Sequence, residues 1–351
     1  MNTPVWFPRG FVPTAGRVPC IVCCTSANEN WQERSDALDR KTRQWYFCTD
    51  QPTGFWDRLI RYPNLATLRA SWQAIQLVKR NRAGLLVTSH PTITFWCAVF
   101  ATLQNVRVDH VALSFYLPKL PHNIAGVLAQ LAYSTVNKFI VHSRAERQIY
   151  SEYFGILPSR FEMQHWGGEL PPVHPSKPLE SGEYICAISE QPQDYPTLLA
   201  AIATLPEIPL VLVVPCRQAI SAKIPPNVTI RRGLSAANRM NILHYSRFMV
   251  LPARNSQIPC DHQVMVAAMQ LGKAFVVSNL ASVNDYAFHH SNAVMYEPSN
   301  PESLAQAIHD LWNNLIKCEI LGTNGKEFAE TFCSQTATQE HFQRLLFRRG
   351  L

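Results

Sequence analysis

One stretch, residues 250–286, constrains what this chain can fold into more than any other (VLPARNSQIPCDHQVMVAAMQLGKAFVVSNLASVNDY). It begins as a short apolar strand and continues as a loop with two prolines, which a helix of apolar periodicity follows. Asp261 is placed to cap that helix and Gly272 to end it, and residues 274–278 are apolar enough for a second buried strand. Strand, helix and strand in this order predict parallel pairing, because parallel strands need a long crossover connection.

The loop of this unit is the first place where we expect a ligand. In an open α/β sheet, ligands bind beyond the carboxyl ends of the strands, which here means residues 252–262. Asp261, His262 and Gln263 stand at the start of the helix, where free backbone N–H groups bind phosphates or sugar hydroxyls. An ordinary helix cap explains Asp261 equally well, and both interpretations stay open.

Apolar strands and helical patterns alternate along the rest of the chain, which predicts an α/β protein with doubly wound sheets. A chain of 351 residues with 47% hydrophobic residues is most simply two domains. The Trp-Gly-Gly at 166–168, followed by four prolines up to Pro178, predicts a stiff linker between them. We therefore expect an N-terminal domain over 1–170, a C-terminal domain over 171–334 and a last helix within 335–351.

Two further helices are marked by the residues that open them. Ser143 and Glu146 have the spacing of a capping box. Asn300 and Pro301 open a helix whose apolar periodicity extends through Leu315.

Composition bears on the compartment and on metals. No segment approaches the ~18 uninterrupted apolar residues that span a bilayer. The first ten residues, MNTPVWFPRG, have neither a charged leader nor an apolar core, so we expect the chain to stay in the cytoplasm. The ten cysteines are scattered, and several lie inside apolar runs, which indicates buried reduced thiols. Cys20, Cys23 and Cys24 lack a second pair or nearby histidines, so we expect no zinc site.

Positive charge is concentrated in the first half of the chain. Residues 1–170 contain 18 Lys and Arg against 11 Asp and Glu, whereas residues 171–351 contain 14 of each. A basic domain of this kind either faces an anionic partner or is simply well solvated, and both interpretations stay open.

Several enzyme classes lack their motifs. The sequence has no Walker A loop and no G-x-G-x-x-G, so a kinase, an NTPase and a dinucleotide oxidoreductase are poorly supported. It has no G-x-S-x-G elbow, which weakens a hydrolase interpretation. The sequence also lacks the interleaved aromatic and basic residues that would predict nucleic-acid binding.

The stretch at 250–286 resembles the donor-sugar segment of retaining GT-B glycosyltransferases of the family-4 type, the glycosyl transferases group 1. The matching pairs are Leu251-Pro252, His262-Gln263, Ala268-Met269, Gly272-Lys273, Val276-Val277 and Asp285-Tyr286. The resemblance implies two Rossmann-like domains facing a cleft, with the last helix crossing back to the first domain. It also implies transfer of a sugar from a nucleoside diphosphate sugar to a hydroxyl, with retention, in polysaccharide or glycolipid assembly.

The resemblance, together with the positions of residues in the predicted loops and at the helix start, gives the candidate site residues. The expected donor-binding residues are Ser189, Gln193, Arg232, Arg254, Asp261, His262, Gln263 and Val264. Arg254 is the best substitute cation for the diphosphate, with Arg231 and Arg232 next, although each is explained more simply as an ordinary surface arginine. We expect no metal and no cofactor besides the donor substrate itself.

The acceptor is expected in the N-terminal domain, where a basic surface suits a sugar or lipid-linked acceptor and peripheral contact at the inner membrane face. His90 follows a predicted strand and is the candidate general base, although a structural histidine explains it equally well. Asn28 and Glu29 follow the first strand and are further acceptor-binding candidates. Asp109 and His110 are discounted as an acid–base pair, because neighbours in a strand point to opposite faces.

The chain departs from the family pattern at the donor motifs. Ala267 stands where the family places a glutamate that holds the ribose, Pro259 lies near the earlier acidic position, and Gln193 replaces an arginine. These departures leave a second hypothesis open, in which a catalytically degenerate GT-B protein acts as a glycan-binding or protein-binding module.

Overall fold

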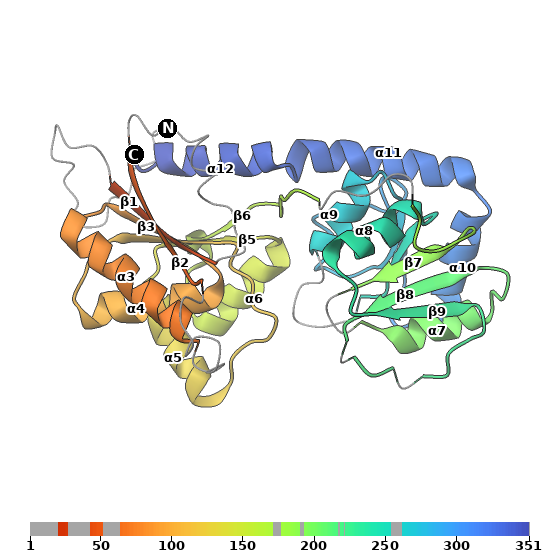
Figure 1. Cartoon of the computed structure of the whole chain (residues 1–351), viewed down its shortest axis with the longest axis horizontal. Helices are drawn as coiled ribbons and strands as arrows, with labels where there is room; N and C mark the ends of the chain where they lie inside the picture. The colour runs from red at the N-terminus through yellow and green to blue at the C-terminus, as the bar shows by residue number, and fades with distance from the viewer. Residues whose placement is uncertain are drawn as a thin grey trace. The chain divides into compact units, whose positions relative to one another are not determined.

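The computed structural model describes residues 20–26, 43–51, 64–170, 177–189, 193–216, 218–220, 222–253 and 262–350. The chain forms two compact units, drawn in Figure 1. Unit 1 consists of Met1–Gln164 and Gln339–Leu351, and unit 2 consists of His165–Thr338. The units therefore divide six residues before the expected boundary at 170, and the last thirteen residues belong to unit 1.

Unit 1 contains a parallel sheet with the strand order β2-β1-β3-β4-β5-β6. Its strands are β1 (Cys20–Thr25), β2 (Gln44–Thr49), β3 (Leu85–Ser89), β4 (Asp109–Leu113), β5 (Lys138–Val141) and β6 (Phe161–Met163). Its helices are α3 (Leu65–Asn81), α4 (Pro91–Leu103), α5 (Asn123–Tyr133), α6 (Arg144–Phe154) and α12 (Gln335–Phe347), the last of which begins in unit 2.

The two faces of this sheet bury different helices. Cys20, Val22 and Cys24 pack with α3 and α4, whereas Ile21 and Cys23 pack with α12. This alternation follows from the two-residue period of a strand. The predicted capping box is confirmed at α6, where the Ser143 side chain accepts from the Glu146 backbone N–H and the Glu146 side chain accepts in return.

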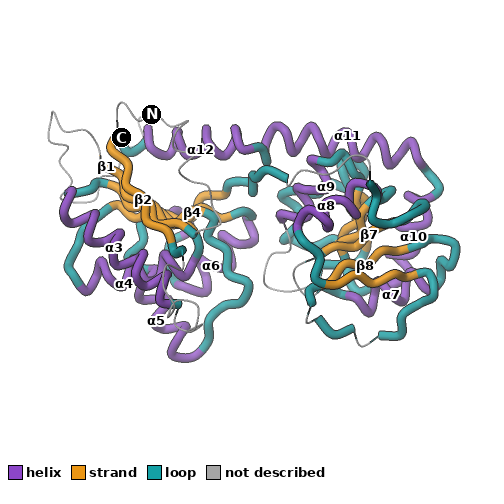
Figure 2. The backbone as a smooth tube through the Cα atoms, in the orientation of Figure 1, coloured by secondary structure: helices purple, strands orange, loops and turns teal. Residues whose placement is uncertain are grey.

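Unit 2 contains the second parallel sheet, with the order β12-β11-β10-β7-β8-β9. Its strands are β7 (Ile185–Ile188), β8 (Leu210–Val214), β9 (Val228–Arg232), β10 (Met249–Leu251), β11 (Phe275–Ser278) and β12 (Val294–Tyr296). Its helices are α7 (Tyr195–Ala203), α8 (Ala236–Tyr245), α9 (His262–Gln270), α10 (Pro301–Trp312) and α11 (Leu315–Phe332). Figure 2 shows the helices on both faces of the sheet.

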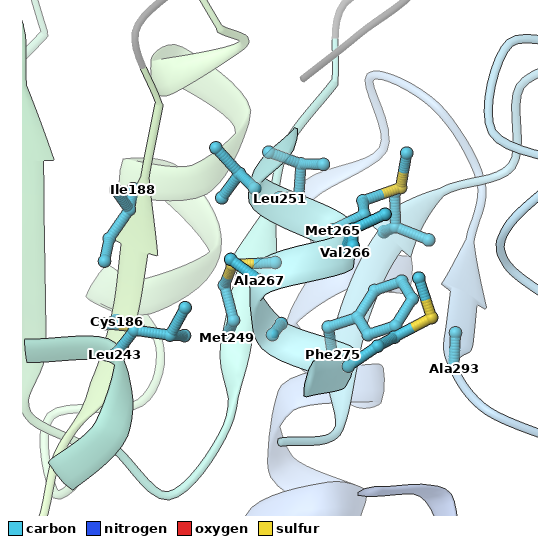
Figure 3. Packing of buried hydrophobic residues seen from close by; sticks show 14 of the residues in the cluster. Cys186, Ile188, Leu243, Met249, Leu251, Met265, Val266, Ala267, Phe275 and Ala293 are labelled. Atoms are coloured by element: carbon cyan, nitrogen blue, oxygen red, sulfur yellow. The ribbon is translucent and has the colours of Figure 1, made fainter. Parts of the chain in front are cut away.

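The helices of unit 2 divide between the faces in the doubly wound manner. Helices α8 and α9 share one apolar cluster, and α7 and α10 share the other. Figure 3 shows part of the first cluster, which includes Met265 of α9 and Phe275 of β11. Gly272 ends α9 with φ of 65°, as the sequence predicted, because glycine adopts a left-handed backbone at little cost.

The expectation of one helix from Pro301 through Leu315 was wrong. Helix α10 ends at Trp312, and α11 begins at Leu315 after Asn314 caps it by accepting from the Lys317 backbone N–H at 2.9 Å. An asparagine side chain offers the backbone a local partner and so favours a new helix start over continuation. Helix α11 then passes close to the turn after α9, since a Cβ at Gly322 would lie 2.1 Å from the Gly272 oxygen.

Candidate active site

The candidate site lies at the carboxyl ends of the central strands of unit 2. Strand β7 is the first strand of the unit along the chain and lies between β10 and β8. Helices α7 and α9, which follow β7 and β10, cover opposite faces of the sheet. The two connections therefore diverge beyond the carboxyl ends of β7 and β10, which is the switch point where doubly wound sheets bind ligands.

Hydrogen bonds connect the carboxyl ends of four neighbouring strands, β7, β10, β11 and β12. The Asp194 backbone N–H, after β7, donates to the Pro252 oxygen, after β10, at 2.8 Å. The Ser278 hydroxyl at the end of β11 donates to the Ala253 oxygen at 2.9 Å, and it accepts from the Tyr296 hydroxyl at 2.8 Å. In the described residues, hydrogen bonds therefore connect the carboxyl ends of β7, β10, β11 and β12 into one framework.

Two predicted donor-binding residues meet at this edge. Ser189 and Gln193 are both 4% exposed, and the Gln193 amide donates to the Ser189 hydroxyl at 2.9 Å. Asp194 next to them caps α7, where its carboxylate accepts from the Thr197 backbone N–H at 3.3 Å and from the Thr197 hydroxyl at 2.8 Å. Buried polar side chains are uncommon unless a structure or a ligand needs them, which makes this pair a candidate part of a ligand site.

His262 occupies the first position of α9 and is 6% exposed. Its ring stacks on Tyr286 with centroids 4.7 Å apart and planes 18° apart. Its Nε2 lies 3.2 Å from the Ser282 oxygen. Because a carbonyl oxygen only accepts, Nε2 carries the proton, and the other ring nitrogen of a neutral imidazole is an acceptor. Of the next two predicted residues, Gln263 is exposed and Val264 is buried in the apolar cluster.

The segment that leads into unit 2 contacts the same helix. Tyr286 accepts a hydrogen bond from the Trp166 backbone N–H at 2.8 Å, and the His165 Nε2 donates to the Asp285 oxygen at 2.9 Å. The Gln270 amide of α9 donates to the Gly168 oxygen at 2.9 Å. The first part of the predicted linker is thus packed against unit 2, while residues 171–176 lie outside the described residues.

The structure does not bring the two arginines of β9 to this position. Arg231 makes two hydrogen bonds to the Glu180 carboxylate, at 2.6 and 3.0 Å, and the Arg232 guanidinium donates to the Gln218 oxygen at 2.5 Å. Strand β9 is the edge strand, and β8 separates it from β7. Both arginines therefore have local partners at the far edge of the sheet.

In unit 1, His90 lies directly after β3 and is exposed. It caps α4, and its Nδ1 accepts from the Thr92 backbone N–H at 3.4 Å. Its φ of 71° places a non-glycine residue in a backbone region that costs energy, a feature that often accompanies functional sites.

The other predicted residues lie outside the described residues. These are Asn28, Glu29, Arg254 and Asp261. Their roles remain predictions from the sequence.

Asp109 and His110 point apart, as expected for neighbours in a strand. Asp109 pairs with Arg349 at 2.5 Å, whereas His110 is 3% exposed, with its Nε2 3.0 Å from the Thr88 hydroxyl. Burial lowers the pKa of His110 to about 3. The folded state therefore binds fewer protons than the unfolded state between that pKa and about 6.5, so stability falls as the pH falls through this range.

We expect His110→Gln to weaken this pH dependence. Glutamine keeps a neutral hydrogen-bonding side chain beside Thr88. His110 accounts for about 2 kcal/mol of the free energy of unfolding that is lost between pH 7 and 5, and we expect the variant not to lose this part. Urea unfolding of both proteins at the two pH values measures the difference. Equal losses in the variant and the wild type would show that His110 is not the group that titrates.

The described residues contain neither a metal-site cluster nor a membrane-spanning helix. Within the ranges given above, no group of three or more His, Cys, Asp and Glu side chains has the arrangement of a metal site. Among the described helices, none is both long enough and apolar enough to cross a membrane.

Sequence reasoning missed the residues that support the site. Tyr286 is fully buried and joins α9 to a segment 120 residues earlier in the chain. Ser278 and Ser282 also contribute contacts that no motif announced. The only signal was the Asp285-Tyr286 pair within the family resemblance.

Comparison with known proteins locates a family match in unit 2. Residues 185–314 match the family model described as Glycosyl transferases group 1. No curated protein matches the sequence. The predicted resemblance to this family is thus confirmed for the segment that contains the candidate site.

Solved structures match over nearly the whole chain. A glycosyltransferase from Rickettsia africae ESF-5 is 12% identical with a TM-score of 0.68, covering 95% of this chain and 98% of that one. Sucrose-phosphate synthase from Thermosynechococcus elongatus is 13% identical with a TM-score of 0.68, covering 94% and 98%. HepE from Anabaena, in complex with UDP and glucose, is 13% identical with a TM-score of 0.65, covering 93% and 99%. The fold is that of the GT-B glycosyltransferases, as predicted.

Proposed function

We propose that this protein is a glycosyltransferase that moves a sugar from a nucleoside diphosphate sugar to a hydroxyl group. The observation that carries the proposal is the buried Ser189–Gln193 pair at the switch point of unit 2. The pair lies within residues 185–314, the part of the chain that matches the glycosyl transferases group 1.

The donor is proposed to bind between the loop after β7 and the start of α9. The free N–H groups at a helix N-terminus attract a diphosphate, and we assign Arg254 in the preceding loop as its cation. We assign the exposed Gln263 to a sugar or ribose hydroxyl. Because HepE was solved with UDP and glucose, uridine diphosphate is the first nucleotide to test.

Catalysis in this proposal depends on positioning and on stabilising the departing diphosphate, without a metal or a covalent nucleophile. We propose retention of configuration, by family resemblance. His90 is assigned to the acceptor side, where its exposed imidazole can take the proton of the acceptor hydroxyl. Asn28 and Glu29 are assigned to the same acceptor.

The acceptor is proposed to be a sugar or a lipid-linked glycan, in polysaccharide or glycolipid assembly. The surplus of positive charge in residues 1–170 supports this, since it favours an anionic or membrane-bound partner. The proposed place of action is the cytoplasm, at the inner face of the membrane.

One observation favours a binding module without turnover. Ala267 stands at the family's ribose-binding position, is 3% exposed and belongs to the apolar cluster under α9. It offers no hydrogen bond to a donor. Losing one charged hydrogen bond weakens binding by about 1.5–3 kcal/mol, or about 10- to 150-fold, unless other groups replace it.

Calorimetric titration with UDP, GDP, ADP and their glucose derivatives tests the proposal. We expect saturable binding of one nucleotide, weakened about 10- to 150-fold in Arg254→Ala and about fivefold in Gln263→Ala. Gln148→Ala on α6 of unit 1 is the matched control and should bind as the wild type does.

The two candidate functions differ in the fate of the bound donor. Slow release of the nucleoside diphosphate from the bound donor, with water as acceptor, would support the transferase. Binding without any release would favour the module, and no binding at millimolar nucleotide would contradict the transferase.

A further inference from the structure

Helix α5 is apolar on the face that it exposes as well as on the face that it buries. Its sequence, NIAGVLAQLAY, contains no charged residue. The buried face consists of small and aromatic residues: Gly126, Ala129, Ala132 and Tyr133. Four large aliphatic residues of α5 are exposed: Ile124 (78% exposed), Val127 (56%), Leu128 (51%) and Leu131 (64%).

The four exposed residues, which we call the α5 stripe, follow the spacing i, i+3, i+4 and i+7. They therefore lie side by side on the helix, opposite the buried face. Scattered apolar residues are normal on a protein surface, but a contiguous stripe marks an interaction site. A surface helix in water usually presents polar residues at these positions.

Packing fixes which face of α5 is turned outward. A Cβ at Gly126 would lie 2.9 Å from the Pro121 oxygen, so the helix approaches this segment more closely than another residue would allow. The Gln130 amide donates to the Tyr153 oxygen of α6 at 2.8 Å. Rotating the helix to bury the stripe would break these contacts, so its exposure is a property of the fold.

Basic residues lie on the chain segments next to α5. Residues 114–160 contain five Lys and Arg but only two Asp and Glu, and one of these, Glu146, is buried in the capping box of α6. Lys119 and Arg147 are exposed. The Arg160 guanidinium donates to the Ser134 oxygen at 2.6 Å, at the C-terminal end of α5.

We propose that the α5 stripe docks unit 1 on the surface of an anionic lipid bilayer. The bilayer offers an apolar layer for the stripe and negative headgroups for the cations on the neighbouring segments, and each contributes to the binding of interfacial helices. A second copy of this chain would instead bring two basic surfaces together. With eleven residues, α5 is about 16 Å long, so it lies in the interface and does not span it.

This inference deepens the proposed function, because it rests on an acceptor that is carried by a lipid. Binding at the bilayer would bring unit 1, the proposed acceptor domain, to the surface where such an acceptor is found.

Co-sedimentation with vesicles tests the inference. The probes are vesicles of phosphatidylglycerol and phosphatidylcholine in equal parts, and vesicles of phosphatidylcholine alone. We expect the wild type to bind the anionic vesicles, and the triple variant Ile124→Gln, Leu128→Gln, Leu131→Gln to lose about tenfold or more in partition constant. The matched control is Ile316→Gln with Ile320→Gln on α11 of unit 2, at positions 71% and 53% exposed, which should bind as the wild type does.

Three outcomes would overturn the inference. The wild type could stay in solution with the anionic vesicles, or the triple variant could bind them as well as the wild type does. In the third outcome, the wild type forms a dimer but binds no vesicles, and the triple variant is a monomer. Thermal melting checks that the variants are folded. No nucleotide is used, so loss of vesicle binding with intact UDP binding rejects only this inference. The reverse result rejects only the proposed donor.

Discussion

Replacing Tyr286 by alanine is expected to lower the free energy of unfolding of unit 2 by about 4 kcal/mol, in the range of buried aromatic truncations. The side chain is fully buried, stacks on His262 and accepts a hydrogen bond from the Trp166 backbone N–H. Its removal leaves a cavity under the start of α9. Urea unfolding followed by circular dichroism measures the loss.

Tyr286→Phe separates the ring from the hydroxyl. The phenylalanine keeps the stacking on His262 and loses the bond from the Trp166 backbone N–H, so we expect a loss of about 1 kcal/mol. If the ring also holds α9 in place, UDP affinity should fall in the alanine variant and stay close to that of the wild type in the phenylalanine variant. An alanine variant as stable as the wild type would show that the cavity collapses and that the ring is not a support.

The contacts of Tyr286 show what sequence reasoning could not reach. The alternation of apolar strands and helical patterns predicted both sheets, because burial on two faces imposes a pattern on neighbouring residues. The contact between Tyr286 and Trp166 joins residues 120 apart, and no local pattern encodes it. The break between α10 and α11 was missed for the opposite reason, since Leu311 and Leu315 continue a helical period across the capping Asn314.

The candidate site was predictable in place but only partly in composition. The rule that ligands bind at the carboxyl ends of strands pointed to the loops after β7 and β10, and Ser189, Gln193 and His262 do lie there. Arg232 does not lie there. The sequence cannot tell that its strand is at the edge of the sheet or that its guanidinium bonds to the Gln218 oxygen. Strand order is a property of the whole unit.

Ala267→Glu tests the departure from the family at its centre. The variant introduces the glutamate that the family resemblance implies for the ribose, at a position that is 3% exposed here, and Figure 3 shows Ala267 on α9 near Met249 and Leu251. Burial raises the pKa of such a carboxyl, and the larger side chain must also displace its neighbours. We expect a loss of about 5 kcal/mol in the free energy of unfolding at pH 7.

The pH dependence identifies the cause. A carboxyl with a raised pKa in the folded state stays protonated there while the unfolded state ionises above about 4.3, so the loss should shrink as the pH falls from 7 to 5. Ala267→Gln has a similar volume without the charge, and its loss should not change over this range. A stable Ala267→Glu variant that binds UDP more tightly than the wild type would contradict the apolar assignment. Position 267 would then face the nucleotide, and the alanine would be a lost donor contact in an otherwise intact transferase site.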